Sequence, residues 1–230
     1  MLTERLTAGG DSFAHRDPKV LGEVTSSRGT SIFDPTKWLY ELDDKVGKDN
    51  HEAFIRYYRD TYAESPRVPC WMALQMSSFG DLSRIYKGCN SGIRDKIAKE
   101  LNVDEEVLGS WLHALGDVRN FCAHHGRLWN RSFSVRVRTL TGPNRLFFWK
   151  QMPADRLFIR LAIIRHLLGR MNDDGEWVEM IDPPFRNDFN NEKVATRMGL
   201  PYRMNGNFKV LLDWTTHPVW TGFYAGKKNT

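Results

Sequence analysis

Side chains suited to acid–base chemistry cluster in the stretch LGDVRNFCAHHGRLWNRSF, residues 115–133, which holds two adjacent histidines and several arginines and asparagines. Arginine and histidine are seldom buried without a partner, so the cluster marks either a solvated surface or a functional site. A site of this kind would transfer protons through histidine and hold an anion through the planar donors of arginine. The elements that position these side chains decide between the two interpretations.

The helix predicted over residues 104–125 carries the cluster, with acids in its first turn and histidines in its last, as the helix dipole favours. One line at steps of three and four is apolar and predicts a buried face: Leu108, Trp111, Leu115, Val118 and Cys122. A second line at similar steps is polar: His113, Asp117, Asn120 and His124. Arg119 lies about 140° around the helix from His124, so a long guanidinium or a second subunit must bridge them. The alternative is that His124 caps the helix and Arg119 forms an ordinary ion pair.

Charge is distributed unevenly in this chain, whose formal net charge is +5 and whose isoelectric point is about 9.1. No Asp or Glu occurs between Val118 and Ala154. The same window interleaves basic and aromatic residues: Arg119, Arg127, Arg131, Arg136, Arg138, Arg145, Lys150, Phe121, Trp129, Phe133, Phe147, Phe148 and Trp149. Basic groups neutralise phosphates and aromatic rings stack on bases, so the window predicts a nucleic-acid partner. The alternative is a solvated basic face.

The composition is that of a folded globular chain, with 230 residues, 41% hydrophobic and 27% charged. The absence of an apolar run of 18 residues and of a signal-peptide pattern predicts a cytoplasmic protein that does not bind a membrane. The three cysteines lack a CxxC spacing, so neither disulfides nor a zinc knuckle is indicated.

Helical spacing recurs along the chain and predicts an all-α fold with a loop-rich C-terminal tail. Helices are expected over 33–47, 50–62, 71–86 with a break at SSFGD, 90–103, 104–125, 155–172 and near 187–198. Residues 134–140 are expected to be an extended segment. We expect one domain, 1–230, made of an irregular N-terminal segment (1–33), a helical core (34–172) and a loop-rich tail with short helices (173–230).

Other chemistries lack their signatures. The sequence has no GxxxxGK[ST] or GxGxxG phosphate loop, no GxSxG nucleophile elbow and no carboxylate cluster near the histidine pair. A zinc ion on His113, Asp117 and His124 is geometrically conceivable, because ligands four residues apart share a helix face. The residue types favour a site without a metal or another cofactor.

Three segments resemble the abortive-infection (Abi) family of bacterial phage-resistance proteins over roughly residues 18–222: VPCWMALQMSSFGDLSRIYKG, VLGSWLHALGDVRNFCAHHGRLWNR and RMGLPYRMNGNFKVLLDWTTHPVW. Members of that family usually carry a further helical region before the point that corresponds to Met1, so the resemblance implies that this chain lacks it. Gln75 stands where the family leads us to expect an acidic residue.

Within the second segment, RNFCAH resembles the RNxxxH signature of HEPN-type ribonucleases, which implies a HEPN-like helical bundle. Such proteins commonly pair two subunits so that both motifs line one cleft. The resemblance implies a homodimeric, metal-independent endoribonuclease that acts as a growth-arresting toxin during phage infection and is restrained by an RNA or protein antitoxin. The alternatives are a module that binds RNA or DNA without cleaving it, an inactive truncated remnant, or a scaffold for a protein partner.

The resemblance also assigns residues to functions. Three take the signature positions and are the expected catalytic group: Arg119, Asn120 and His124. His125 and Asp117 are either catalytic or structural. Four following residues are expected to hold the RNA strand: Arg127, Trp129, Asn130 and Arg131.

Overall fold

The computed structural model describes residues 1–47, 52–62, 67–140, 152–171, 177, 180–181, 192–200, 202–205 and 208–211. The described part is mostly helical, and its strands form two short antiparallel hairpins, so the predicted all-α class is confirmed. The structure divides into two compact units, Met1–Lys99 and Glu100–Thr230. One reason is that residues 6–89 close an apolar core of their own.

The first unit is built from helices at the positions that the sequence predicts. They are α2 (Pro35–Gly47), α3 (Ala53–Thr61), α4 (Cys70–Gln75), α5 (Phe79–Gly88) and α6 (Ser91–Glu100), which ends at the division. The N-terminal segment has more regular structure than the sequence predicts, with helix α1 (Leu2–Leu6), a 3₁₀ turn η1 (Ala14–Arg16) and strands β1 (Val24–Thr25) and β2 (Ser31–Phe33). Close packing supports strand β2, because its Phe33 ring lies directly against Gly88 of α5. A Cβ atom added at Gly88 would lie 2.6 Å from that ring.

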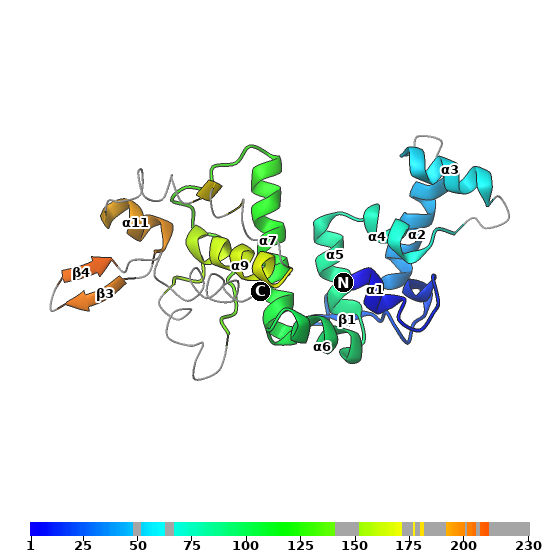
Figure 1. The fold of residues 1–230 in the computed structure, drawn as a ribbon, viewed down its shortest axis with the longest axis horizontal. Coiled ribbons are helices and arrows are strands. Elements are labelled where there is room, and N and C mark those ends of the chain that lie inside the picture. The colour runs from blue at the N-terminus through cyan, green and yellow to red at the C-terminus, as the bar shows by residue number, and fades with distance from the viewer. Residues whose placement is uncertain are drawn as a thin grey trace, which may run out of the picture. The chain divides into compact units, whose positions relative to one another are not determined.

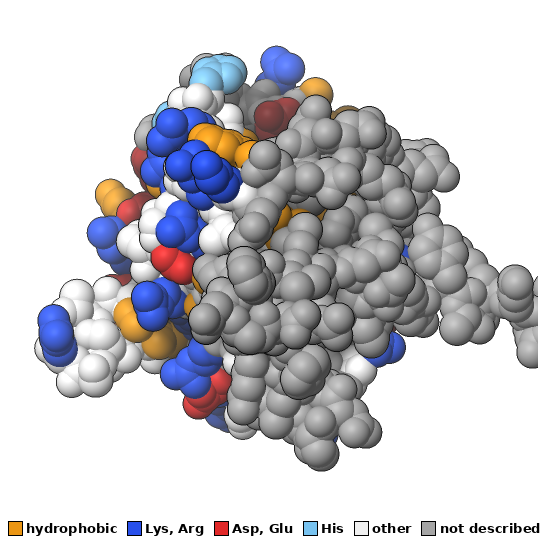
Figure 2. Space-filling model, turned by 90° about the vertical axis from the view of Figure 1, so that its left-hand side faces the viewer, with side chains coloured by type: hydrophobic (Ala, Val, Ile, Leu, Met, Phe, Trp, Pro, Cys, Tyr) orange, Lys and Arg blue, Asp and Glu red, His pale blue; other side chains and the backbone are white. Residues whose placement is uncertain are grey.

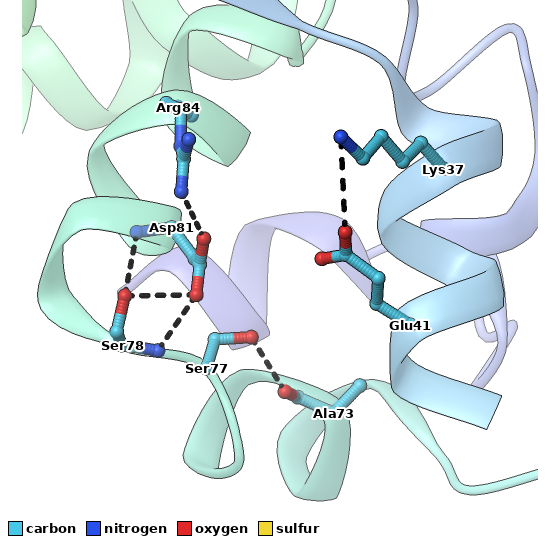
Figure 3. Close-up of polar contacts among 7 residues, drawn as sticks. All are labelled: Lys37, Glu41, Ala73, Ser77, Ser78, Asp81 and Arg84. Atoms are coloured by element: carbon cyan, nitrogen blue, oxygen red, sulfur yellow. Dashed lines mark hydrogen bonds and ion pairs between the residues drawn. The ribbon is translucent and has the colours of Figure 1, made fainter. Parts of the chain in front are cut away.

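Local capping fixes where two of these helices begin. Asp34 accepts hydrogen bonds from the backbone N–H groups of Thr36 and Lys37 and so satisfies the start of α2. At the SSFGD break, Ser78 and Asp81 form a reciprocal capping box that starts α5 and separates it from α4 (Figure 3). The break therefore divides two helices and is not a kink within one.

The buried face of α3 differs from the predicted one. The spacing of Phe54, Tyr57, Tyr58 and Tyr62 predicts one apolar stripe. Phe54 and Tyr58 pack against the core, but Tyr57 is 73% and Tyr62 is 55% exposed, whereas Ile55 is completely buried. A tyrosine hydroxyl keeps its hydrogen bonds to water on the surface, while isoleucine has none to lose on burial.

The second unit contains α7 (Glu105–Ala123), α9 (Leu157–Arg170), α11 (Glu192–Met198) and the hairpin of β3 (Tyr202–Asn205) and β4 (Phe208–Leu211). Helices α7 and α9 pack against each other (Figure 1). Residues 134–140 contain no helix or strand, as predicted. The hairpin lies in the tail where the sequence predicts loops and short helices, although alternating residues around Gly206 and Asn207 are a recognisable hairpin signal.

The helical spacing of Leu157, Leu161, Ile164 and Leu168 predicts one apolar stripe along α9, but the helix is buried on more sides than this stripe. Ile159 and Ile163 are buried, and so are Arg160 and Arg165, whereas Leu161 of the predicted stripe is half-buried. None of the helices in the described part of the chain has the length and apolar character needed to cross a membrane.

Candidate functional site at the end of helix α7

Helix α7 places the candidate residues by burying its first half and exposing its last turns. Its buried residues include Leu108, Trp111 and Ala114, and the Trp111 ring nitrogen donates to the Arg138 carbonyl at 2.9 Å. Further along the predicted apolar line, Leu115 and Val118 are half-buried and Cys122 is exposed. The prediction of a buried line is therefore wrong at Cys122, because the helix extends beyond the core that covers its first turns.

The three signature residues are all on the exposed end of this helix. Arg119, Asn120 and His124 are exposed, and the Arg119 guanidinium donates to the side-chain oxygen of Asn120 at 3.3 Å. None of the ion pairs among the described residues includes Arg119, so the structure does not show the ordinary ion pair of the alternative interpretation. Asn120 is thus able to position the cation of its neighbour.

The two histidines form the helix terminus. His124 is the C-cap, and its backbone N–H donates to the Asn120 carbonyl at 3.1 Å. His125 donates to the Cys122 carbonyl and Gly126 to the Phe121 carbonyl, which is the pattern of a Schellman motif. His125 occupies the left-handed position of that motif with φ +52°. Glycine usually takes this position, because a Cβ atom there costs roughly 1–2 kcal/mol.

Backbone hydrogen bonds join the segment after the histidines to the residues just before α9. Phe133 donates to the Asp155 carbonyl at 2.8 Å, and Val137 donates to the Ala154 carbonyl at 3.2 Å. The Ser132 hydroxyl also donates to the Asp155 carboxylate, and this bond holds the pKa of that carboxyl below its ordinary value. These bonds hold residues 132–137 of the loop after α7 in place.

Alternating cations and rings connect the same loop to both helices. The Arg131 guanidinium lies 3.9 Å from the centre of the Phe121 ring, and Phe121 meets Phe133 edge-to-face with 5.7 Å between ring centres. On the other side of Phe133, the Arg160 guanidinium lies 4.0 Å from the ring centre. Cation–π contacts of this kind are each worth about 0.5–2 kcal/mol.

Arg160 is completely buried and is the structural centre of this arrangement. Its guanidinium donates to the carbonyls of Ala154, Arg156 and Val135. Burial lowers its pKa to about 10, although the carboxylates of Asp117 and Asp155 act in the opposite direction, so the group stays charged at neutral pH. Asp117 is half-buried, and one of its carboxylate oxygens has no hydrogen-bond partner among the described residues.

The predicted RNA-binding residues differ in how much of each side chain is exposed to solvent. Arg127 is exposed, whereas Trp129, Asn130 and Arg131 are half-buried, and Arg131 also donates to the Arg127 carbonyl at 2.7 Å. Figure 2 shows basic side chains gathered beside histidine on one face of the described surface.

Other basic and aromatic residues of the acid-free window have structural contacts or lie outside the described residues. Arg138 forms an ion pair with Glu106, and Phe133 is buried in the core. The sequence analysis missed Arg197 of α11, whose guanidinium lies 5.9 Å from the centre of the Trp129 ring. Nothing in the local sequence indicates that contact. Five of the basic and aromatic residues of the window lie outside the described ranges: Arg145, Phe147, Phe148, Trp149 and Lys150.

Within the described ranges, no three His, Cys, Asp or Glu side chains are grouped closely enough to hold a metal ion, and this includes His113, Asp117 and His124.

A helical protein with a basic, histidine-containing surface at a helix terminus is the class that this fold and site define. The family model of the Abi-like proteins matches residues 1–130, a range that contains all three signature residues and ends in the loop after α7. The chain belongs to the Abi-like family, and this membership supports a role in abortive infection, a form of phage resistance. Neither a curated protein nor a solved structure matches the chain.

Proposed function

We propose that this Abi-like protein is a metal-independent, HEPN-type endoribonuclease that acts as a toxin in abortive infection. The observation that carries the proposal is the exposure of Arg119, Asn120 and His124 together at the end of α7, with Arg119 bonded to Asn120 and not to a carboxylate. Exposed side chains of these types are accessible to an RNA strand. Membership of the Abi-like family supports the biological context.

The proposed chemistry uses the 2′-hydroxyl of RNA as the nucleophile. His124 takes the 2′-hydroxyl proton while a bond forms from the 2′-oxygen to phosphorus, and the bond from phosphorus to the 5′-oxygen breaks. Arg119 stabilises the negative charge that develops on the phosphorane, and Asn120 positions Arg119. The products are a 2′,3′-cyclic phosphate and a 5′-hydroxyl. Proton transfer of this kind contributes about 10²- to 10⁴-fold to the rate.

The loop after α7 is proposed to hold the RNA strand. Arg127 is exposed and offers its charge to phosphate, and Trp129 offers part of a ring face to a base. Asn130 and Arg131 shape the turn over residues 127–131. Asn130 has a positive φ, and the Arg131 side chain donates to the Arg127 carbonyl. The contact between the Phe133 and Phe121 rings keeps this loop beside the last turns of α7.

Two copies of the chain are proposed to pair at this end of α7. Regular helix geometry separates Arg119 from His124 by about 140° around the axis, so a second copy would complete the site. Cys122 offers a direct test, since it is exposed in the last turn while Cys70 and Cys89 are buried. Pairing should slow the reaction of Cys122 with a thiol reagent as the protein concentration rises. A labelling rate independent of concentration, with a monomer in sedimentation, would refute the pairing.

The nuclease is tested by incubating the purified chain with labelled cellular RNA in excess EDTA and analysing the product ends. We expect 2′,3′-cyclic phosphate ends from the parent and none from His124→Ala, with RNA affinity nearly unchanged. His113→Ala is the matched control, because it removes another exposed histidine of the same helix, three turns earlier. Intact RNA, or equal cleavage by the parent and His124→Ala, would refute the proposal.

A non-catalytic RNA- or DNA-binding module is the second candidate. It is favoured by Gln75, the last residue of α4, which is neutral where the Abi resemblance predicts an acidic side chain. In that case His124→Ala should have little effect, and Arg127→Ala should weaken binding in a salt-dependent manner. Control of the protein by an RNA or protein antitoxin is proposed under either function.

A further inference from the structure

His125 has a backbone conformation that residues other than glycine seldom adopt, with φ +52°. Among the described non-glycine residues, three have a positive φ, and the other two, Asn102 and Asn130, are asparagines, which adopt the left-handed region with little strain. At the left-handed position of a Schellman motif, glycine would end α7 equally well. The helix terminus by itself therefore gives no reason for a histidine at this position.

The glycine of this helix terminus, Gly126, is not the residue with the left-handed conformation. Gly126 lies one position later, where a Cβ atom would come within 3.0 Å of the Phe121 carbonyl oxygen. Glycine is thus present where the backbone approaches closely, and histidine is present where glycine is usual. Residues held in disfavoured conformations concentrate at functional sites, so the imidazole of His125 is the feature that needs a function.

The proposed cleavage lacks one proton-transfer group. His124 takes the proton of the nucleophile, but the departing 5′-oxygen also needs a proton. The charged groups on the last turns of α7 and in residues 124–140 after it are Asp117, Arg119, Arg127, Arg131, Arg136 and Arg138. The arginines do not release protons near neutral pH, and Asp117 is half-buried. His125 is exposed and directly adjacent to His124, with Cα atoms about 3.8 Å apart.

We propose that His125 is the general acid of the site, so that adjacent histidines of one chain supply both proton transfers. This inference rests on the proposed ribonuclease function. As the bond from the 2′-oxygen to phosphorus forms, His124 gains the 2′-hydroxyl proton. As the bond from phosphorus to the 5′-oxygen breaks, protonated His125 gives its proton to that oxygen. Exchange with water then restores both imidazoles, and no oxidant or metal is needed.

The backbone between the two histidines permits this division of functions. In a continuing helix, successive side chains diverge by about 100°. Here the chain leaves helical geometry at His124, with φ −99° and ψ 19°, and becomes left-handed at His125. The 100° angle between successive side chains of a regular helix therefore does not apply to the two imidazoles. Both are exposed at the same helix terminus.

The test measures RNA cleavage in excess EDTA from pH 5 to pH 9 (about the range in which histidine titrates) for the parent, His125→Gly and His125→Asn. Both replacements suit a left-handed residue, so melting temperatures should be unchanged, or raised for glycine. Cleavage should fall about 10²- to 10⁴-fold, and the limb of the pH profile that requires a protonated acid should disappear. His113→Asn is the matched control, because it alters another exposed histidine of α7, three turns before the site, and should keep the parental rate.

A substrate with sulfur in place of the bridging 5′-oxygen separates the two histidines, because a thiolate leaves without being protonated. This substrate should restore cleavage by His125→Gly but not by His124→Ala. Parental rates for His125→Gly with both limbs present, or rescue of His124→Ala instead, would overturn the assignment. If the parent does not cleave RNA at all, the proposed function fails first, which is a distinct result from a fully active His125→Gly.

Discussion

His15 makes the first unit sensitive to acid. Its side chain is 1% exposed, its ring meets Trp38 edge-to-face with 5.9 Å between centres, and neither ring nitrogen has a hydrogen-bond partner in the described part of the chain. Burial lowers the pKa of His15 to about 4, and the nearby positive charge of Arg16 acts in the same direction. The carboxylates of Asp43 and Asp11 oppose this shift without cancelling it.

The sign follows from proton binding. The unfolded chain binds a proton at His15 below pH 6.5, whereas the folded chain does so only below about pH 4. Stability is therefore independent of this group above pH 6.5 and falls as the pH decreases. Each pH unit in that interval costs about 1.4 kcal/mol, so protonation removes about 3 kcal/mol of unfolding free energy by pH 4.

Urea unfolding followed by circular dichroism, together with hydrogen exchange of the α2 amides, should measure this loss. His15→Phe keeps a planar ring beside Trp38 but does not titrate, so it should lose about 3 kcal/mol less than the parent between pH 7.5 and pH 4. The comparison at pH 7.5 removes any packing difference between the two proteins. A stability difference between parent and variant that is the same at both pH values would refute a buried, neutral His15.

Three further predictions follow from single contacts. Arg160→Met leaves three carbonyl acceptors without their donor and should lower the free energy of unfolding by about 3 kcal/mol in urea titrations, and a loss under about 1 kcal/mol would contradict its central position. Ser78→Ala should cost about 1 kcal/mol through the capping box, and Ser77→Ala, outside that box, should cost less (Figure 3). Arg127→Ala should reduce the slope of log RNA affinity against log salt by about 1, whereas Arg138→Ala, whose charge is already offset by an ion pair, should change it less.

The order of the helices was predictable because its signals are local. Asp34 and Pro35 mark the start of α2, Gly47 marks its end, and Ser78 with Asp81 starts α5. A cap needs only partners within three residues, so the sequence contains all the information that the cap uses. The position of the candidate site on the last turns of α7 follows from the same kind of local periodicity.

The buried faces were less predictable, because burial depends on what packs against a helix. Tyr57 is on the surface although it belongs to the aromatic stripe of α3, and Cys122 is exposed although it continues the apolar line of α7. Arg160 would be assigned to the surface by its charge, yet carbonyls from distant residues and the Phe133 ring provide the partners that allow its burial.

The sequence by itself determined the helix order, the all-α class and the presence of arginine, asparagine and histidine at one helix terminus. Only the tertiary structure decided that the loop after α7 is fixed to α9 through Arg160, and that this arginine is buried. The physical reason is range: capping and periodicity act within one turn, whereas core packing and the satisfaction of buried charges depend on residues tens of positions apart.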